Sequence, residues 1–298
     1  MRVNRREFLA LASLPLLSGS FRTLAEEGSG MFVCMHEITS ITFDYRTAME
    51  GYARAGIRAV EPDLGKVREF AQQESPRIAR QLLDDLGLKV VSCSNQLFLE
   101  ESGPRRAAAL EDLKWKVELA EVIGADRMVV PSAASEPHTI DDYQQVIANL
   151  REAADIAQPH KVTLMVEHTR LSTLITNLRT ALMVVRKVDH PNLKVMLDTF
   201  HFWSGMSKFE DLELLQDGEL HHLHFEDIPA YPPLETFGQQ SRVFPGEGIA
   251  PLRRIIEVLQ RKGYRGPASL ELFNPVVQAT DPYEIAMKAR QTIEPLIG

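Results

Sequence analysis

The sequence predicts an α/β fold, a single-domain (β/α)8 barrel in which parallel strands are enclosed by helices. Eight short apolar runs recur along the 298 residues, each is followed by a stretch with helical periodicity, and no linker divides the chain. Strands of a parallel barrel are buried on both faces and therefore read as continuous apolar runs. A doubly wound open sheet is the weaker alternative, because the sequence has no GxGxxG or GxxxxGK(S/T) phosphate turn.

The predicted strands are short, and the stretches between them carry apolar residues at helical spacing. The strands are expected at residues 31–35, 57–61, 89–93, 127–131, 162–167, 194–198, 222–225 and 268–272. The helices are expected at residues 45–55, 76–86, 104–123, 140–158, 173–188, 209–216, 250–262 and 283–296. Several of these helices begin at Pro or Ser and end at Gly, which is the usual order of helix start and stop residues.

The composition excludes several classes of protein. Hydrophobic residues make up 44% and charged residues 25% of the chain, which is typical of a globular protein and not of a disordered one. The net charge is −8 and no basic run offers a track for a phosphate backbone, so we expect no nucleic-acid partner. Cys34 and Cys93 show no CxxC spacing, which argues against a cysteine zinc site or a disulfide framework.

Residues 1–25 have the pattern of an export signal. Arg5 and Arg6 precede an apolar stretch at residues 8–17, which is too short for a membrane span of about 20 residues. The arginine pair followed by Phe8 and Leu9 resembles a twin-arginine signal. We therefore predict a signal at residues 1–25, a barrel at residues 31–298, no stable membrane span, and export to the periplasm or beyond by the twin-arginine machinery. An amphipathic N-terminal helix is the alternative.

Four successive predicted strands end at a residue able to bind a metal ion. These residues are Glu167, Asp198, His224 and Glu271. In a barrel the C-terminal ends of neighbouring strands face one mouth, so we expect the four side chains to converge there. Burying carboxylates without a partner costs several kcal/mol, so a shared divalent cation is indicated. Three carboxylates and one imidazole suit Mn²⁺ best, while Mg²⁺, Co²⁺, Zn²⁺ or Fe²⁺ also fit.

Each carboxylate also has a structural interpretation. A carboxylate at a strand end can cap the next helix or pair with an arginine, and Asp198, followed by Thr199, fits the capping role well. Capping explains any one of the positions, but it explains four successive strand ends less well. The metal site remains the favoured interpretation of the set.

The residues around these strand ends resemble the xylose isomerase-like TIM-barrel superfamily, and its sugar phosphate isomerase/epimerase branch in particular. The resemblance covers roughly residues 31–296 and depends on the order of five motifs. The motifs are Val166-Glu167-His168, Met196-Leu197-Asp198-Thr199-Phe200-His201, His222-Leu223-His224-Phe225-Glu226-Asp227, Arg242-Val243-Phe244-Pro245-Gly246-Glu247-Gly248 and Leu270-Glu271-Leu272-Phe273-Asn274-Pro275.

The resemblance implies that the four strand-end residues are the metal ligands and that Glu167 and Glu271 move the proton. It also implies a substrate-oxygen contact for His201 and substrate binding for Arg242. The chain departs from the pattern of ketose 3-epimerases at Thr173, where they carry a glutamate six residues beyond the first ligand. That departure argues against this particular activity.

Other polar and aromatic residues are weaker candidates. Trp203 can stack on a sugar ring from the loop after the sixth strand, although core packing explains it equally well. His36 and Glu61 stand at the ends of the first two strands, where substrate contacts are expected. Alternation along the seventh strand places His222 on the same side as His224 and turns His221 away.

The predicted activity is that of a metal-dependent sugar isomerase or epimerase, in which a proton beside a carbonyl is moved through an enediolate. The substrate is expected to be a small sugar or keto-sugar, and the sequence leaves the oligomeric state open. A metal-dependent lyase or hydratase of an oxidised sugar is the first alternative, because its reaction begins with the same proton abstraction. A noncatalytic sugar-binding barrel is the second. An apurinic endonuclease would need more histidines and a basic face.

Overall fold

The computed structural model describes residues 30–94, 97–99 and 101–298. Its strands are β1 (Phe32–His36), β2 (Ala59–Glu61), β3 (Lys89–Val90), β4 (Arg127–Pro131), β5 (Thr163–Glu167), β6 (Leu193–Asp198), β7 (Leu220–His224) and β8 (Pro267–Leu270). They form one parallel sheet in the order β3-β2-β1-β8-β7-β6-β5-β4. The predicted signal at residues 1–25 lies outside the described residues.

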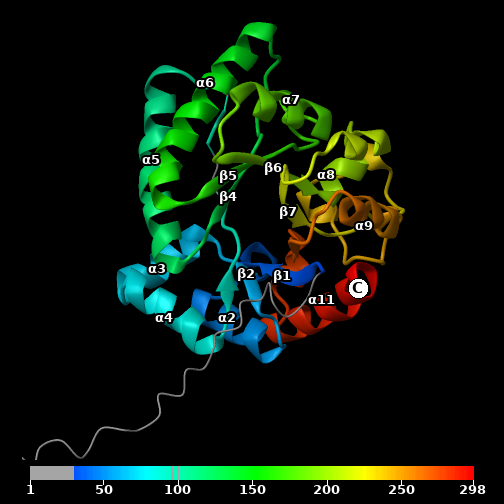
Figure 1. Ribbon diagram of the computed structural model, residues 1–298. Coiled ribbons are helices and arrows are strands. Elements are labelled where there is room, and N and C mark those ends of the chain that lie inside the picture. The colour runs from blue at the N-terminus through cyan, green and yellow to red at the C-terminus, as the bar shows by residue number, and fades with distance from the viewer. Residues whose placement is uncertain (1–29, 95–96, 100) are drawn as a thin grey trace, which may run out of the picture.

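The sheet closes on itself beyond β3. The backbone N–H of Cys93 donates to the carbonyl of Arg127 at 3.2 Å, and the N–H of Val129 donates to the carbonyl of Cys93 at 2.7 Å. A parallel bridge between Ser94 and Val129 continues this contact. The chain therefore forms the predicted single-domain (β/α)8 barrel, with helices around the strands in Figure 1.

Most of the helices cover the outside of the barrel, and the short helices that follow β6 and β8 lie at the C-terminal end of the strands. They are α2 (Tyr45–Arg54), α3 (Leu64–Gln73), α4 (Pro76–Leu86), α5 (Gly103–Ile123), α6 (Ile140–Ala157), α7 (Leu178–Val188), α8 (Thr199–Ser204), α9 (Leu252–Arg261), α10 (Pro275–Gln278) and α11 (Pro282–Ile297). Short 3-10 helices include η1 (Glu37–Ser40) and η3 (Phe209–Leu214). No helix among the described residues combines the length and the apolar character that crossing a membrane requires.

The structure differs from the predicted helices at several positions. The segment before β7, expected to be an α-helix at residues 209–216, is the 3-10 helix η3. Helices α3, α8 and α10 were not predicted. The helix expected from residue 173 begins only at Leu178, behind the N-cap Asn177. Residues before it form a loop because the Thr173 backbone N–H donates to the carbonyl of Ala134 at 2.9 Å.

Strand alternation builds the barrel interior in layers. Cys34, Ala59 and Val91 form one small buried cluster, and Val129, Met165 and Met196 form another, both separate from the main core between the sheet and the helices. Two residues further along β1, β2, β5 and β6, the same inward side carries polar residues, which are His36, Glu61, Glu167 and Asp198. The polar end of the barrel interior therefore lies directly above a layer of packed apolar side chains.

Candidate metal centre

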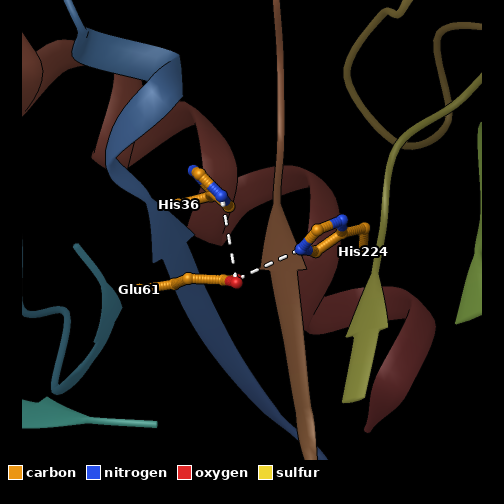
Figure 2. Close-up of side chains that lie close together, drawn as sticks. All are labelled: His36, Glu61 and His224. Carbon is orange, nitrogen blue, oxygen red and sulfur yellow. Dashed lines mark hydrogen bonds and ion pairs between the residues drawn. The ribbon is translucent and has the colours of Figure 1, made fainter. Parts of the chain in front are cut away.

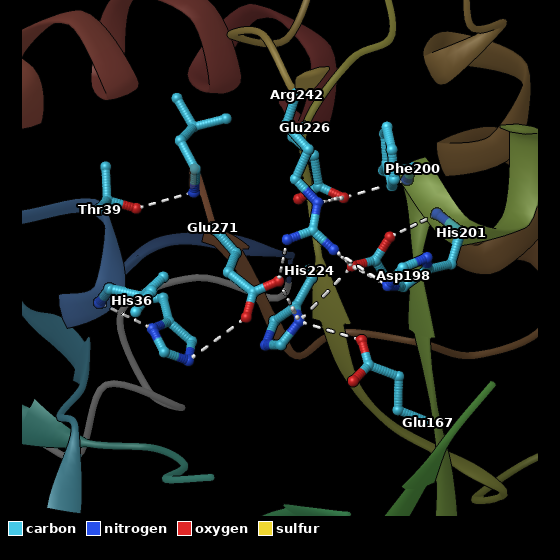
Figure 3. A network of polar contacts seen from close by, with 12 residues as sticks. His36, Thr39, Glu167, Asp198, Phe200, His201, His224, Glu226, Arg242 and Glu271 are labelled. Atoms are coloured by element: carbon cyan, nitrogen blue, oxygen red, sulfur yellow. Dashed lines mark hydrogen bonds and ion pairs between the residues drawn. The ribbon is translucent and has the colours of Figure 1, made fainter. Parts of the chain in front are cut away.

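Four side chains converge at the C-terminal ends of β5 to β8. Glu167, Asp198 and His224 are the last residues of β5, β6 and β7, and Glu271 directly follows β8. Their ligand atoms all lie within 4.8 Å of one another. His224 Nδ1 lies 3.2 Å from Glu271 Oε2, 3.5 Å from Glu167 Oε1 and 3.8 Å from Asp198 Oδ2. Figure 3 shows the three carboxylates around the imidazole of His224.

The local structure explains how Asp198 reaches this position. Asp198 ends β6 and is also the N-cap of α8, where its Oδ1 accepts a hydrogen bond from the backbone N–H of His201 at 2.7 Å. Its other oxygen, Oδ2, faces the cluster. Capping and cluster membership were alternatives from the sequence, but the two oxygens of one carboxylate serve both.

Arg242 occupies one side of the cluster. Its NH2 group lies 2.7 Å from Asp198 Oδ2 and its NH1 group lies 2.8 Å from Glu271 Oε2. The guanidinium is only 1% exposed and packs over the rings of Phe200 and Phe273 at 5.0 and 4.7 Å from their centres. The sequence argument favoured a metal ion over an arginine as the source of compensating charge, and the structure shows that Arg242 supplies one positive charge.

Burial and charge act against each other on the pKa values of the cluster. Burial raises the pKa of Glu167 to about 7, although His224 opposes the shift. Burial would also raise the pKa of Asp198, but Arg242 and His201 outweigh it and hold that pKa below its usual range. Burial lowers the pKa of His224, but Glu271 and Glu61 reverse this effect and raise the pKa well above its ordinary value. The cluster therefore attracts positive charge strongly.

The arrangement fits a divalent cation. Glu167 Oε1 and His224 Nδ1 are buried and have no hydrogen-bond partner, and both belong to the same four-residue cluster. Buried polar atoms without partners are rare and call for an explanation such as an ion. The buried Arg242 forms ion pairs with Asp198, Glu226 and Glu271, so one arginine charge faces three buried carboxylates. Oxygen and imidazole donors suit Mn²⁺, Mg²⁺ or Zn²⁺.

A cavity of about 640 Å³ opens over the cluster. Glu167, His224 and Glu271 line its floor, while Arg68 and Trp115 line its wall. This volume is in the range of small-molecule sites. A second cavity of about 490 Å³ lies at the opposite end of the barrel, where the strands begin, and contains none of the predicted site residues. Barrel enzymes react at the C-terminal end, so the first cavity is the relevant one.

His36 and His201 both line the cavity. His36 Nδ1 accepts a hydrogen bond from the Ile38 backbone N–H at 3.0 Å, and His36 Nε2 lies 3.6 Å from Glu271 Oε1. His201 Nδ1 accepts from the Arg170 backbone N–H at 3.2 Å, and His201 Nε2 lies 3.1 Å from an Arg242 nitrogen. Both rings therefore hold one nitrogen on the backbone and turn the other toward the site.

Trp203 is a predicted site residue that belongs neither to the four-residue cluster nor to the lining of this cavity. Its side chain lies on α8 and the residue is 37% exposed. Successive helical residues are rotated by about 100°, so the inward direction of His201 turns Trp203 toward the opposite side of the helix. The stacking contact expected for Trp203 has no support in this structure.

Two carboxylates near the site have positions that the sequence did not reveal. Glu61 was expected to contact substrate, but it is fully buried and lies against His222 and His224. Glu226 is fully buried, and its Oε1 accepts a hydrogen bond from the Phe200 backbone N–H at 3.0 Å. The position of Glu226, two residues beyond His224, was the feature of the sequence that could have predicted its place near the site. His222 lies on the same side as His224, as alternation predicts.

Comparison with known proteins gives relatives of two kinds. The chain is 28% identical over 188 residues to an inosose isomerase from Halalkalibacterium halodurans, covering 61% of this chain and 66% of that one. It is 28% identical over 231 residues to a 3-dehydroshikimate dehydratase from Pseudomonas putida, covering 76% of this chain and 35% of that one. The chain thus spans about a third of the dehydratase and just under two thirds of the isomerase.

The fold and the family agree with these likenesses. A crystal structure of the IOLI protein with a bound zinc atom superposes with a TM-score of 0.83 at 21% identity, covering 89% of this chain and 98% of the other. The family model described as a xylose isomerase-like TIM barrel matches residues 50–294. The chain therefore belongs to the xylose isomerase-like TIM-barrel family.

Proposed function

We propose that the protein is a divalent-metal-dependent isomerase or epimerase of a sugar or cyclic polyol ketone. The observation that carries the proposal is the convergence of Glu167, Asp198, His224 and Glu271 on one buried point beneath a cavity. Mn²⁺ is the cation we propose for this point. When bound, it would act as a Lewis acid that stabilises negative charge on the substrate carbonyl oxygen. The inosose isomerase relative supports the same class of reaction.

The two glutamates are placed to move a proton. Glu167 and Glu271 come from β5 and from the end of β8, with β6 and β7 between them, so they reach the cavity floor from different sides. One removes a proton from the carbon beside the carbonyl, and the other returns a proton to the neighbouring carbon or to the opposite face of the same carbon. The choice between these two outcomes separates isomerisation from epimerisation.

The surrounding side chains hold the substrate. His36 and His201 each direct one ring nitrogen toward the cavity, where it can bond a hydroxyl or carbonyl oxygen. Arg242 lies beside Glu271 and can stabilise an oxyanion that forms next to that carboxylate. Its burial keeps water away from this position.

A dehydratase acting on a hydroxylated cyclic ketone is the second candidate. The 3-dehydroshikimate dehydratase relative supports it, and Thr173 argues against a ketose 3-epimerase. The first step is again removal of a proton beside a carbonyl. The departing hydroxyl can then take the abstracted proton from the glutamate and leave as water, while His36, which lines the same cavity, can hydrogen-bond it.

The test is proton exchange with solvent. Protein loaded with Mn²⁺ is incubated in deuterated water with an inosose, D-fructose, D-psicose or 3-dehydroshikimate, and the products are followed by NMR and mass spectrometry. The proposal expects carbon-bound deuterium without a change in composition, and Glu271→Gln should abolish it. Loss of water supports the dehydratase. Binding without deuterium incorporation supports a noncatalytic sugar-binding barrel and overturns the proposal.

A further inference from the structure

His224 belongs to two groups of side chains that could hold a cation. One group is Glu167, Asp198, His224 and Glu271, and the other is His36, Glu61 and His224. The first group surrounds His224 Nδ1, whereas Glu61 lies on the side of Nε2. Figure 2 shows Glu61 between the rings of His36 and His224. The two groups therefore share this one imidazole, with a different ring nitrogen facing each group.

The two groups exclude each other chemically. A histidine that binds a cation through one ring nitrogen keeps its proton on the other nitrogen. His224 Nε2 lies 3.2 Å from Glu61 Oε2, which is within hydrogen-bond distance. His224 Nδ1 has no hydrogen-bond partner. The hydrogen bond to Glu61 thus uses Nε2 as the donor, and Nδ1 is the ring nitrogen that faces the four-residue group.

Glu61 is held firmly enough to impose this choice. Its Oε2 accepts hydrogen bonds from Ser269 Oγ at 3.1 Å and from His222 Nε2 at 2.8 Å. These partners belong to β8 and β7, while Glu61 ends β2, so three strands fix the carboxylate. Glu61 is fully buried, which makes its hydrogen bonds stronger than the same bonds in water.

We propose that Glu61 is a positioning residue that keeps the proton of His224 on Nε2 and thereby directs the cation to Nδ1 and the four-residue group. The inference rests on the proposed function, because it explains how that metal centre is selected over the neighbouring group of His36, Glu61 and His224. Mutation of a carboxylate that accepts the second N–H of a metal-binding histidine typically lowers metal affinity 10- to 100-fold.

The experiment measures metal binding and proton position separately. Mn²⁺ affinity is measured by calorimetry without substrate in the wild type and in Glu61→Ala, Glu61→Gln and Glu37→Gln. The nitrogen that carries the proton is identified by nitrogen-15 NMR of histidine-labelled protein loaded with diamagnetic Zn²⁺. Glu37→Gln is the matched control, because Glu37 is also a fully buried glutamate, beyond the end of β1, and lies in neither group.

In the wild type we expect the His224 proton on Nε2 and zinc on Nδ1. Mn²⁺ affinity should fall about 100-fold in Glu61→Ala and about 10-fold in Glu61→Gln, which keeps an acceptor oxygen but loses the charge. In Glu61→Ala the proton of His224 should no longer be confined to Nε2. A general loss of stability would not cause this change in the folded protein. If Glu61→Ala does not fold, Glu61→Gln decides the affinity.

Two results would overturn the inference. The first is zinc on His224 Nε2 in the wild type, and the second is an affinity in the Glu61 variants within twofold of the control. Failure of the proposed function looks different. If the wild type binds both cations as expected but catalyses no proton exchange, the proposed reaction is wrong. The proposed role of Glu61 in metal binding is then unaffected.

Discussion

At the scale of single residues, Asp198 illustrates how two interpretations of one carboxylate can both hold. Its Oδ1 caps α8 through the His201 backbone N–H, and its Oδ2 lies 2.7 Å from Arg242. The strand-end position of Asp198 was readable from the sequence, whereas the contact with Arg242 was not, because 44 residues separate the two. Long-range pairs of this kind depend on the folded barrel rather than on local pattern.

Variants of Asp198 and His201 should separate metal binding from substrate binding. Asp198→Ala removes one member of the four-residue group and should lose bound Mn²⁺. His201→Ala should keep the metal and lower kcat/KM about tenfold, since one substrate hydrogen bond of about 1–2 kcal/mol is lost. Elemental analysis of purified protein, together with steady-state kinetics, checks both. Metal loss in His201→Ala would contradict the assignment.

Glu37 gives a prediction about pH. Glu37 is fully buried, and its burial raises its pKa well above the ordinary value. One hydrogen bond, from the Asp63 backbone N–H at 2.8 Å, opposes this shift but does not cancel it. The folded state then holds a proton that the unfolded state releases above about pH 4.5, and stability falls as pH rises until the raised pKa is passed. Glu37→Gln removes this loss because an amide stays neutral.

Thermal unfolding of the wild type and Glu37→Gln at several pH values tests this expectation. The two proteins should unfold at similar temperatures near pH 4.5, and the variant should gain a few degrees over the wild type by pH 8. Comparing the two at each pH cancels the effect of other titrating groups. A difference that stays constant with pH would show that Glu37 is not the cause.

At the scale of elements, the strands were easier to predict than the helices at the mouth of the barrel. Buried parallel strands appear in the sequence as apolar runs, so the prediction placed all eight strands within a few residues of their observed positions. Helix α8 has only six residues and is set by its Asp198 cap and by Glu226, which accepts from the Phe200 backbone N–H. Such a short element has too few residues for a periodic pattern, so the sequence could not reveal it.

The 3-10 helix η1 fixes the strand end that carries Glu271. Thr39 Oγ1 donates to the carbonyl of Leu270 at 3.0 Å and accepts from the backbone N–H of Leu272 at 3.0 Å, so one hydroxyl bonds both neighbours of Glu271. Thr39 is fully buried. Thr39→Val keeps the shape but leaves both backbone groups unpaired.

We expect Thr39→Val to lower the free energy of unfolding by about 1–3 kcal/mol and to weaken Mn²⁺ binding. The hydroxyl of Thr39→Ser keeps both hydrogen bonds, so this control should bind Mn²⁺ like the wild type. Denaturant unfolding and calorimetry measure the two effects. Equal behaviour of the Val and Ser variants would mean that the hydroxyl does not position Glu271.

At the scale of the whole molecule, the barrel concentrates its polar interior at one end. Along β5 and β6 the inward side runs from the apolar Met165 and Met196 to the charged Glu167 and Asp198. The period-2 pattern made this arrangement predictable once the barrel was assumed. Closure between β3 and β4 was less predictable, because it uses Cys93 and Ser94 beyond the regular part of β3.

Export of the folded molecule is the remaining proposal at this scale. The arginine pair at positions 5 and 6 predicts the twin-arginine route, which carries proteins that have already folded and would allow the buried metal centre to be filled before export. Lysine keeps the charge of arginine but lacks its planar, five-donor guanidinium, so recognition of the pair should be lost when both residues become lysine.

Cell fractionation in a Gram-negative host tests this proposal with the full chain. The wild type is expected in the periplasmic fraction, whereas the Arg5→Lys, Arg6→Lys double variant should accumulate, folded and metal-loaded, in the cytoplasm. A third protein, with Arg2→Lys, is the matched control, because it makes the same change outside the pair and should be exported normally. If the double variant reaches the periplasm as efficiently as this control, the segment does not direct the protein to the twin-arginine machinery.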